Sequence, residues 1–411
     1  MVDSITLRAV LPEGMSAEEQ SQYGFPFSIG QRVNEQGETT HRFLEEETLV
    51  SPLTGAKCKV RALAHTPAAL DWLSGYELKV NPPACLIGRN YLLVNGVYQA
   101  ARGALELLKH HAASRGCSAE GVELLKLENT KLASVTNCFL FEFDTPADAL
   151  AAKQELRDYL EGVLNYVLPA DSTRKGKKAK KPCFSVGPDG TFSVYVRLRH
   201  MSVLAYIKEP DVPGAFAEFP SEEVKEQLEA LAQRTLRVEI TVHEKWLRDN
   251  DLDSPEAWRD NPAAYEKVFG LLLKALRLGE NLRCRAPSEA VIAKLPEDHQ
   301  TILIDHLKGD NARCHSLVLN CEGHGKALTD ARNKRFSAFK CSILEATGID
   351  ITIPWEIQST KLSPRLREWL KVPGEYEPDE TLAEIIYSRV SVPAVIRHLQ
   401  EKTAEILARR D

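Results

Sequence analysis

The sequence predicts an α+β fold, in which an antiparallel sheet with flanking helices is followed by a mainly α-helical C-terminal domain. Several short segments alternate apolar and polar residues, which is typical of strands that bury one face. Up to about residue 250 these segments mix with helical patterns in a strand–helix–strand order, and beyond it helical patterns dominate. We therefore expect two domains, 1–250 and 251–411, with a boundary near residues 249–256.

Strand-like segments open the first domain. Alternation begins at residues 4–11 and returns at 57–64 and 76–80, where Asn81-Pro82-Pro83 ends the pattern. Residues 12–57 are polar, with glycine and proline interspersed, and they favour no clear assignment. A helix is expected at 97–113. Residues 133–144 are apolar on both faces, which predicts a central, buried strand.

Helices and strands then alternate to the end of the first domain. Thr145, Pro146 and Asp148 have the residue types of a helix N-terminus, so a helix is expected directly after the buried strand. Ser221 likewise precedes a helix whose first turn is acidic. Further strands are expected at 191–199, 201–208 and 234–242. In the second domain helical patterns occur at 255–278, 289–307, 329–347, 379–387 and 392–409.

The composition is that of a soluble protein. Of the 411 residues 43% are apolar and 27% are charged, which excludes collagen, a coiled coil, wholesale disorder and a small disulfide scaffold. No stretch is apolar enough to predict a membrane span or a secretory signal. The nine cysteines include no C-x-x-C pair, so we expect reduced thiols and a cytoplasmic location.

Positive charge is concentrated in one segment, although the net charge is −6. Two readings are open: a solvated loop, or an arm that lies along phosphates and releases counterions when it binds. The six cations are Arg174, Lys175, Lys177, Lys178, Lys180 and Lys181.

Two of the predicted strands each carry a polar row opposite an apolar face. A tyrosine, a lysine, an acid and histidines would converge if these strands are neighbours, with Tyr206 and Glu239 turned toward one groove that has room for a phosphate and an ion. The first row contains His200, Ser202, Leu204, Tyr206 and Lys208, and the second contains Arg237, Glu239, Thr241 and His243.

Such a set has the groups for phosphoryl transfer to a tyrosine. A tyrosine hydroxyl has a pKa of about 10, and a nearby cation makes its oxyanion more accessible. A divalent ion held by carboxylate and imidazole would neutralise a phosphodiester oxygen. The alternative is that these rows merely face solvent, which is normal on antiparallel sheets. Phosphate-binding glycine loops and the serine-hydrolase elbow are absent.

Several segments together resemble the filamentous-phage gene II replication initiators, the II/X family of phage and plasmid replication proteins. Their order and spacing, from residue 3 to 351, carry the resemblance. They are the strand at 3–11, N-P-P-A-C-L-I-G-R-N at 81–90, A-K-Q at 152–154, S-T-R-K at 172–175, R-H-x-x-x-L-A-Y-x-K at 199–208, L-R-V-E-I at 236–240 with Lys245-Trp246-Leu247, and the segment 328–351 that ends in G-I-D-I.

The resemblance implies rolling-circle initiation by the 1–250 domain. Members of this family bind a double-stranded origin, nick one strand with a tyrosine using Mg²⁺, and later cut and join the displaced single strand, while a host helicase and polymerase act on the DNA. Carried over by position, Tyr206 would be the nucleophile with Lys208 beside it, Glu239 would hold Mg²⁺ (or Mn²⁺), and Arg237 would contact a phosphate. The location implied is the cytoplasm of a bacterial host.

Two departures from the family pattern bear on the metal site. Phe139 stands where the family has an aspartate, and Arg89 stands where it has a histidine. Glu142, Asp144 and His243 are therefore additional candidate ligands, and Arg89 and His200 are candidate DNA contacts. The alternative is a non-catalytic origin-binding or regulatory protein. In the second domain Arg332, Lys334 and Arg335 either contact DNA from a recognition helix or form a solvated basic face.

Overall fold

The computed structural model describes the chain except for residues 89–93, 95, 168–182, 187–191, 198–200, 209–221, 276–281, 363, 372–391 and 411. Its centre is a nine-stranded sheet with strand order β4-β5-β6-β1-β7-β11-β10-β9-β8, in which every neighbouring pair is antiparallel. The expected α+β fold is confirmed. The strands are β1 (Val2–Val10), β4 (Glu46–Val50), β5 (Lys57–Thr66), β6 (Ala69–Val80), β7 (Thr130–Glu142), β8 (Cys183–Val186), β9 (Phe192–Arg197), β10 (Met201–Ile207) and β11 (Thr235–His243).

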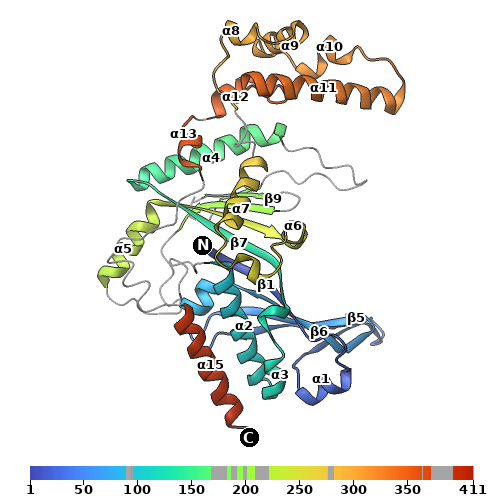
Figure 1. Ribbon diagram of the computed structural model, residues 1–411, viewed down its shortest axis with the longest axis vertical. Helices are drawn as coiled ribbons and strands as arrows, with labels where there is room; N and C mark the ends of the chain where they lie inside the picture. The colour runs from blue at the N-terminus through green and yellow to red at the C-terminus, as the bar shows by residue number, and fades with distance from the viewer. Residues whose placement is uncertain are drawn as a thin grey trace.

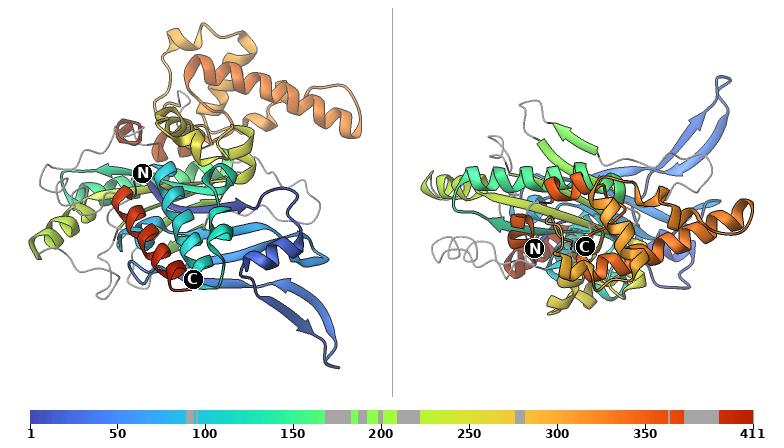
Figure 2. Two further views of the ribbon diagram at one scale, coloured as in Figure 1. Left: turned by 60° about the horizontal axis from the view of Figure 1, so that its bottom comes forward. Right: turned by 90° about the horizontal axis from the view of Figure 1, so that it is seen from above.

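Helices cover one face of this sheet (Figures 1 and 2). Ile5, Leu7 and Ala9 of β1 are buried beneath them, while the residues between these three remain partly exposed. Each strand can bury only alternate side chains against the helices, so its other side chains form a second, polar face. The helices that follow or pack on the strands include α2 (Val97–Ser114), α3 (Ala119–Glu123), α4 (Pro146–Val167), α5 (Glu222–Gln233), α6 (Glu244–Asp249) and α7 (Pro262–Ala275). Helix α15 (Val392–Ala408) packs on α2.

The chain between β1 and β4 contains structure that the sequence pattern did not indicate. Helix α1 (Ala17–Tyr23) begins with a capping box between Ser16 and Glu19. Strands β2 (Ile29–Val33) and β3 (Thr39–Leu44) form a separate two-stranded ribbon that extends away from the rest of the molecule (Figure 2). The N-terminus of α4 is as expected, since Thr145 accepts a hydrogen bond from the Asp148 amide at 3.1 Å.

The buried apolar side chains of the described residues form two clusters. The larger cluster includes the sheet and buried residues of α7, α15 and the short helix α13 (Pro364–Trp369), so it extends across residue 250. The smaller cluster joins residues from 295 to 351, in helices drawn at one end of Figure 1. These are α8 (Glu289–Ile292), α9 (Glu297–Leu307), α10 (Ser316–Leu319) and α11 (Gly325–Thr347), followed by α12 (Trp355–Lys361). The domain boundary near residue 250 stays a prediction.

Two of the helices expected in the second half are broken. The expected helix at 255–278 is a 3₁₀ turn, Pro255–Trp258, followed by α7, and residues 276–278 lie outside the described residues. Pro296 separates α8 from α9, because a proline interrupts helical hydrogen bonding, so residues 289–307 are not one helix. The expected helix at 379–387 lies outside the described residues. Within the described part of the chain, no helix is both long and apolar enough to span a membrane.

Candidate active site

Tyr206 and Glu239 are in direct contact on the polar face of the sheet. The Tyr206 hydroxyl donates a hydrogen bond to Oε1 of Glu239 at 2.5 Å. In the register of β10 and β11, Tyr206 lies opposite Arg237 and Leu204 lies opposite Glu239, so the hydroxyl reaches diagonally across the two strands. The two side chains share one face, as their alternation predicts. The expected space between them for a phosphate and an ion is closed by the hydrogen bond.

Burial changes the acidity of both groups. The pKa of Glu239 is raised to about 7, first because burial disfavours the carboxylate and second because Asp3 lies nearby. The hydrogen bond from Tyr206 and the charges of Arg237 and Lys208 lower that pKa and only partly offset the rise. Burial and then the charge of Glu239 raise the pKa of Tyr206 above its ordinary value. Near neutral pH, Glu239 is therefore close to its midpoint and can take up a proton.

Arg237 provides a fixed positive charge at the tyrosine. Arg237 is only 3% exposed and lies opposite Tyr206 in the register of the two strands. Burial lowers the pKa of Arg237, but Cys138, Tyr206 and Glu239 raise it by more, so the guanidinium stays charged. Lys208 is half-buried directly after β10 and acts electrostatically on Glu239. The tyrosine oxygen is thus held between an acid and a cation.

Asp3 is the site residue that sequence reasoning missed. It is 9% exposed, and its Oδ1 accepts a hydrogen bond from Nδ2 of Asn81 at 3.3 Å. The register of β1 against β7 shifts between Val2 and Ser4, which breaks the alternation at Asp3. Alternation places Asp3 on the same face as Ile5, which is buried in the core. An acid at such a position is unusual, and this was the sequence signal that could have identified Asp3. Asp3 supplies a second carboxylate close to Glu239.

Of the two departures from the family pattern, Phe139 lies in the described part of the chain and Arg89 lies outside it. Phe139 points into the helix-covered core, where its ring centroid lies 4.9 Å from that of Phe269. The neighbouring residue Cys138 lies directly opposite Glu239, and burial raises the pKa of its thiol to about 12. An acid at position 139 would therefore not face Tyr206 in this register. A side chain at position 138 faces Tyr206 instead.

The other predicted metal ligands do not join Glu239. His243 shares its face but lies four residues along β11, roughly 13 Å away. Glu142 forms an ion pair with Arg234 at 2.6 Å near the end of β7, and Asp144 is exposed beyond that end. Among the residues that the structure describes, no group of three or more His, Cys, Asp or Glu side chains could hold a metal ion. The remaining donor set is the pair Glu239 and Asp3.

The predicted DNA contacts are only partly described. His200, Arg89 and the six cations of the basic segment (Arg174, Lys175, Lys177, Lys178, Lys180 and Lys181) lie outside the described residues. On α11, Arg332 and Arg335 donate hydrogen bonds at 3.0 Å to the carbonyl oxygens of Leu319 and Asn320. These two arginines therefore hold the end of α10 against α11, whereas Lys334 is exposed.

The chain was compared with protein-family models, with curated proteins and with solved structures. None of the three comparisons found a match.

Proposed function

We propose that this protein is a rolling-circle replication initiator that transfers one DNA strand to Tyr206, like the gene II family it resembles. The observation that carries the proposal is the 2.5 Å hydrogen bond between the Tyr206 hydroxyl and Glu239, with Arg237 opposite the tyrosine. An adjacent base that can take the proton of a tyrosine is one way to make the hydroxyl a useful nucleophile. A carboxyl whose pKa is about 7 suits that role near neutral pH.

The proposed step is an in-line displacement at phosphorus. The Tyr206 oxygen forms a bond to the phosphorus of a phosphodiester, and its proton passes to Oε1 of Glu239. The bond from phosphorus to the 3′ oxygen breaks, and that oxygen becomes a 3′-hydroxyl with a proton from water. The product is a 5′-phosphotyrosine link. Attack by a 3′-hydroxyl on this link reverses the step and rejoins a strand.

Positive charge supports the step at two points. Arg237, opposite Tyr206, stabilises through its charge the phenolate that develops as the proton leaves. Lys208, beside the pair, attracts the phosphodiester and offsets the charge that gathers on its oxygens. Arg237 acts through the tyrosine, whereas Lys208 lies nearer to solvent.

A magnesium or manganese ion belongs to the proposal through the resemblance. The donor set fits such an ion, because Mg²⁺ is usually held by one or two carboxylates together with substrate phosphates. Glu239 and Asp3 are two carboxylates near enough to raise the pKa of Glu239, a repulsion that a cation would relieve. When bound, the ion would neutralise a phosphodiester oxygen. Double- and single-stranded origin DNA and a host helicase and polymerase are the proposed partners, in the cytoplasm of a bacterial host.

The test is a covalent adduct. The full chain is incubated with Mg²⁺ or Mn²⁺ and a 3′-labelled pool of random single-stranded oligonucleotides, and label that stays with the denatured protein is measured. Tyr206→Phe should abolish the adduct. Tyr23→Phe is the matched control, since Tyr23 is half-buried on α1 and its hydroxyl makes no hydrogen bond within the described part of the chain. An undiminished adduct in Tyr206→Phe would reject the assignment.

The alternative function is origin binding without nicking. It is favoured by one observation: among the described residues, Glu239 is joined by a single further carboxylate and by no third ligand. This alternative predicts salt-sensitive DNA binding by the wild-type chain and no labelled adduct with either metal ion.

A further inference from the structure

A polar groove lies on the same face of the sheet, beside the Tyr206–Glu239 pair. Its volume is about 370 Å³, and its floor is made by β1, β4, β5, β6, β7 and β11. Thr241 in this floor lies two residues along β11 from Glu239, a distance of roughly 7 Å. The groove therefore begins where the candidate active site ends. The residues that line it are Ser4, Thr6, Glu46, Lys59, Arg61, Glu77, Lys79, Ser134, Thr136, Thr241 and His243.

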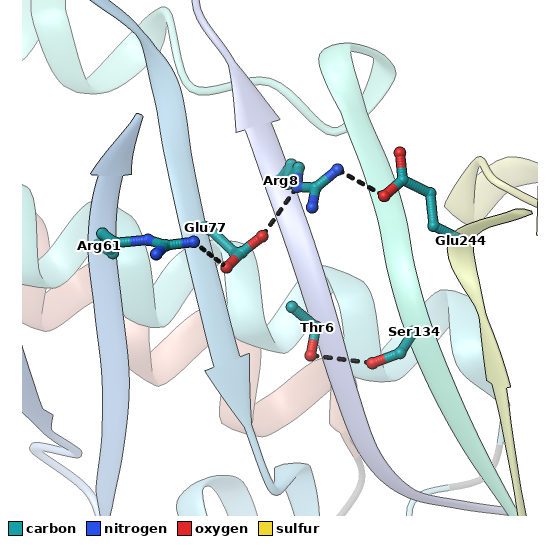
Figure 3. Close-up of polar contacts among 6 residues, drawn as sticks. All are labelled: Thr6, Arg8, Arg61, Glu77, Ser134 and Glu244. Atoms are coloured by element: carbon teal, nitrogen blue, oxygen red, sulfur yellow. Dashed lines mark hydrogen bonds and ion pairs between the residues drawn. The ribbon is translucent and has the colours of Figure 1, made fainter. Parts of the chain in front are cut away.

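Hydroxyl groups cross the middle of this floor in rows. Ser4 donates to Thr136 at 2.8 Å, and Thr136 lies 2.9 Å from the hydroxyl of Thr241, so three neighbouring strands are linked. Ser134 donates to Thr6 at 2.9 Å in a second row, which Figure 3 shows on the open side of the strands. Serine and threonine hydroxyls both donate and accept hydrogen bonds, and they commonly contact phosphate and sugar oxygens of nucleic acids.

Charges of both signs flank the hydroxyl rows. Glu77 accepts hydrogen bonds from Arg8 and from Arg61, each at 2.8 Å, and Arg8 also binds Glu244 at 2.8 Å (Figure 3). Lys59 is paired with Glu46. Lys79 is exposed and makes no ion pair or hydrogen bond within the described residues. The lining therefore has three cations and two carboxylates, with only a small excess of positive charge.

We infer that this groove binds a single strand of DNA and leads it to Tyr206, an inference that rests on the proposed function. Lys79 and the hydroxyls would contact the sugar-phosphate chain. The carboxylates would accept hydrogen bonds from the exocyclic amines of cytosine and adenine, which are donors. A simple polyanion has no hydrogen-bond donors that these carboxylates could accept from, and the carboxylates would repel its charges. The volume is at the low end of the range of about 300–1,000 Å³ for small-ligand sites, which suits one or two nucleotides rather than a duplex.

The test measures binding apart from nicking. Fluorescence anisotropy is recorded for a labelled mixed-sequence 20-nucleotide single strand and for its duplex, with the full chain without metal. Lys79→Ala, and separately Thr6→Val with Ser134→Ala, should weaken single-strand binding about tenfold, as expected for lost hydrogen bonds to a charged group. Lys79→Ala should also reduce the steepness of the salt dependence of log K by about 0.7. The control Lys126→Ala removes an exposed lysine that does not line the groove and lies 3.7 Å from Glu128, and it should change affinity less than twofold.

The outcomes separate this inference from the proposed function. If the groove variants bind the single strand as tightly as the wild-type chain while the adduct still forms, the groove inference is wrong and the nicking proposal stands. If they lose binding but the wild-type chain forms no adduct, the groove inference stands and the nicking proposal fails. Complete displacement of the single strand by heparin at equal charge, or equal loss of duplex binding in the groove variants, would identify a general polyanion or duplex site and overturn the inference. Circular dichroism melting of each variant verifies that it is folded.

Discussion

Arg237 lies directly opposite Tyr206 on the adjacent strand, and its charge offsets part of the rise in the pKa of the tyrosine. The tyrosine hydroxyl donates its proton toward Glu239. A cation on one side and a proton acceptor on the other both favour the ionised tyrosine in the transition state, although burial disfavours it in the resting protein.

Tyr206→Phe should raise the pKa of Glu239 above its present value of about 7. The hydrogen bond from Tyr206 stabilises the charged carboxylate, and its loss leaves the carboxylate buried with one partner fewer. Carbon-detected NMR of labelled glutamate side chains would measure the change. Tyr23→Phe should leave the titration where it is, and a fall in the pKa of Glu239 would show that the hydrogen bond does not act as described.

Glu239 should make the protein less stable as the pH rises from about 4.5 to 7. Its pKa is near 4.5 in the unfolded chain and about 7 in the folded one, so in this window the folded state binds more protons. The contribution is fully present below about pH 4.5 and is lost as the pH rises through 7. Its size is on the order of 3 kcal/mol. Urea unfolding at a series of pH values should show that the free energy of unfolding falls across this window in the wild-type chain and not in Glu239→Gln.

Asp3→Asn should lower the pKa of Glu239, because the charge of Asp3 is one of the two causes that raise it. If Glu239 takes the proton of Tyr206, the yield of adduct should rise with pH as Glu239 ionises. The midpoint of this rise should move to lower pH by the same amount as the pKa of Glu239 measured by NMR. Asp71→Asn, at an exposed position of β6, is the control and should move neither curve. A lower adduct yield without a shifted limb would point to a role of Asp3 in folding or metal binding only.

Phe139→Asp should destabilise the fold strongly and should not build a better metal site. The substitution removes a buried ring that packs 4.9 Å from Phe269 and places a charge in the core, at a cost of roughly 3–5 kcal/mol or more. Cys138→Asp instead adds a carboxylate opposite Glu239 on the polar face. Manganese binding followed by electron paramagnetic resonance should therefore become tighter in Cys138→Asp. Tighter binding in a folded Phe139→Asp variant would refute the assigned faces.

Sequence alternation was sufficient for the strands that bury one face. Tyr206 and Glu239 were assigned to a shared face because polar residues recur at every second position of both strands, with Leu204 as the exception, and β10 pairs with β11 without a register shift. The segment before β4 could not be assigned, since β2 and β3 are exposed on both faces and so have no apolar side to reveal them. Helix α1 could have been predicted from the capping box of Ser16 and Glu19, which a search for apolar periodicity does not detect.

The residues that surround Tyr206 and Glu239 were harder to predict than the contact between these two. Alternation identifies which residues share a face, but it does not tell how far apart they lie along a strand, and His243 and Glu142 share the face at too great a distance. Asp3 was missed for the opposite reason, because an irregularity in β1 turns it toward the polar face against the local pattern. Such a bulge depends on the partner strand and cannot be read from one segment alone.

The ten buried residues of the smaller apolar cluster, between Leu295 and Ile351, form a core that is separate from that of the sheet. Cooperative unfolding follows shared burial, so helices α8 to α11 can open as a unit of their own while the sheet stays intact. Amide hydrogen exchange in this segment would then report a lower opening free energy than in β7 and β11. A partner that binds to α11 and dissociates from it would therefore leave Tyr206 and Glu239 in place.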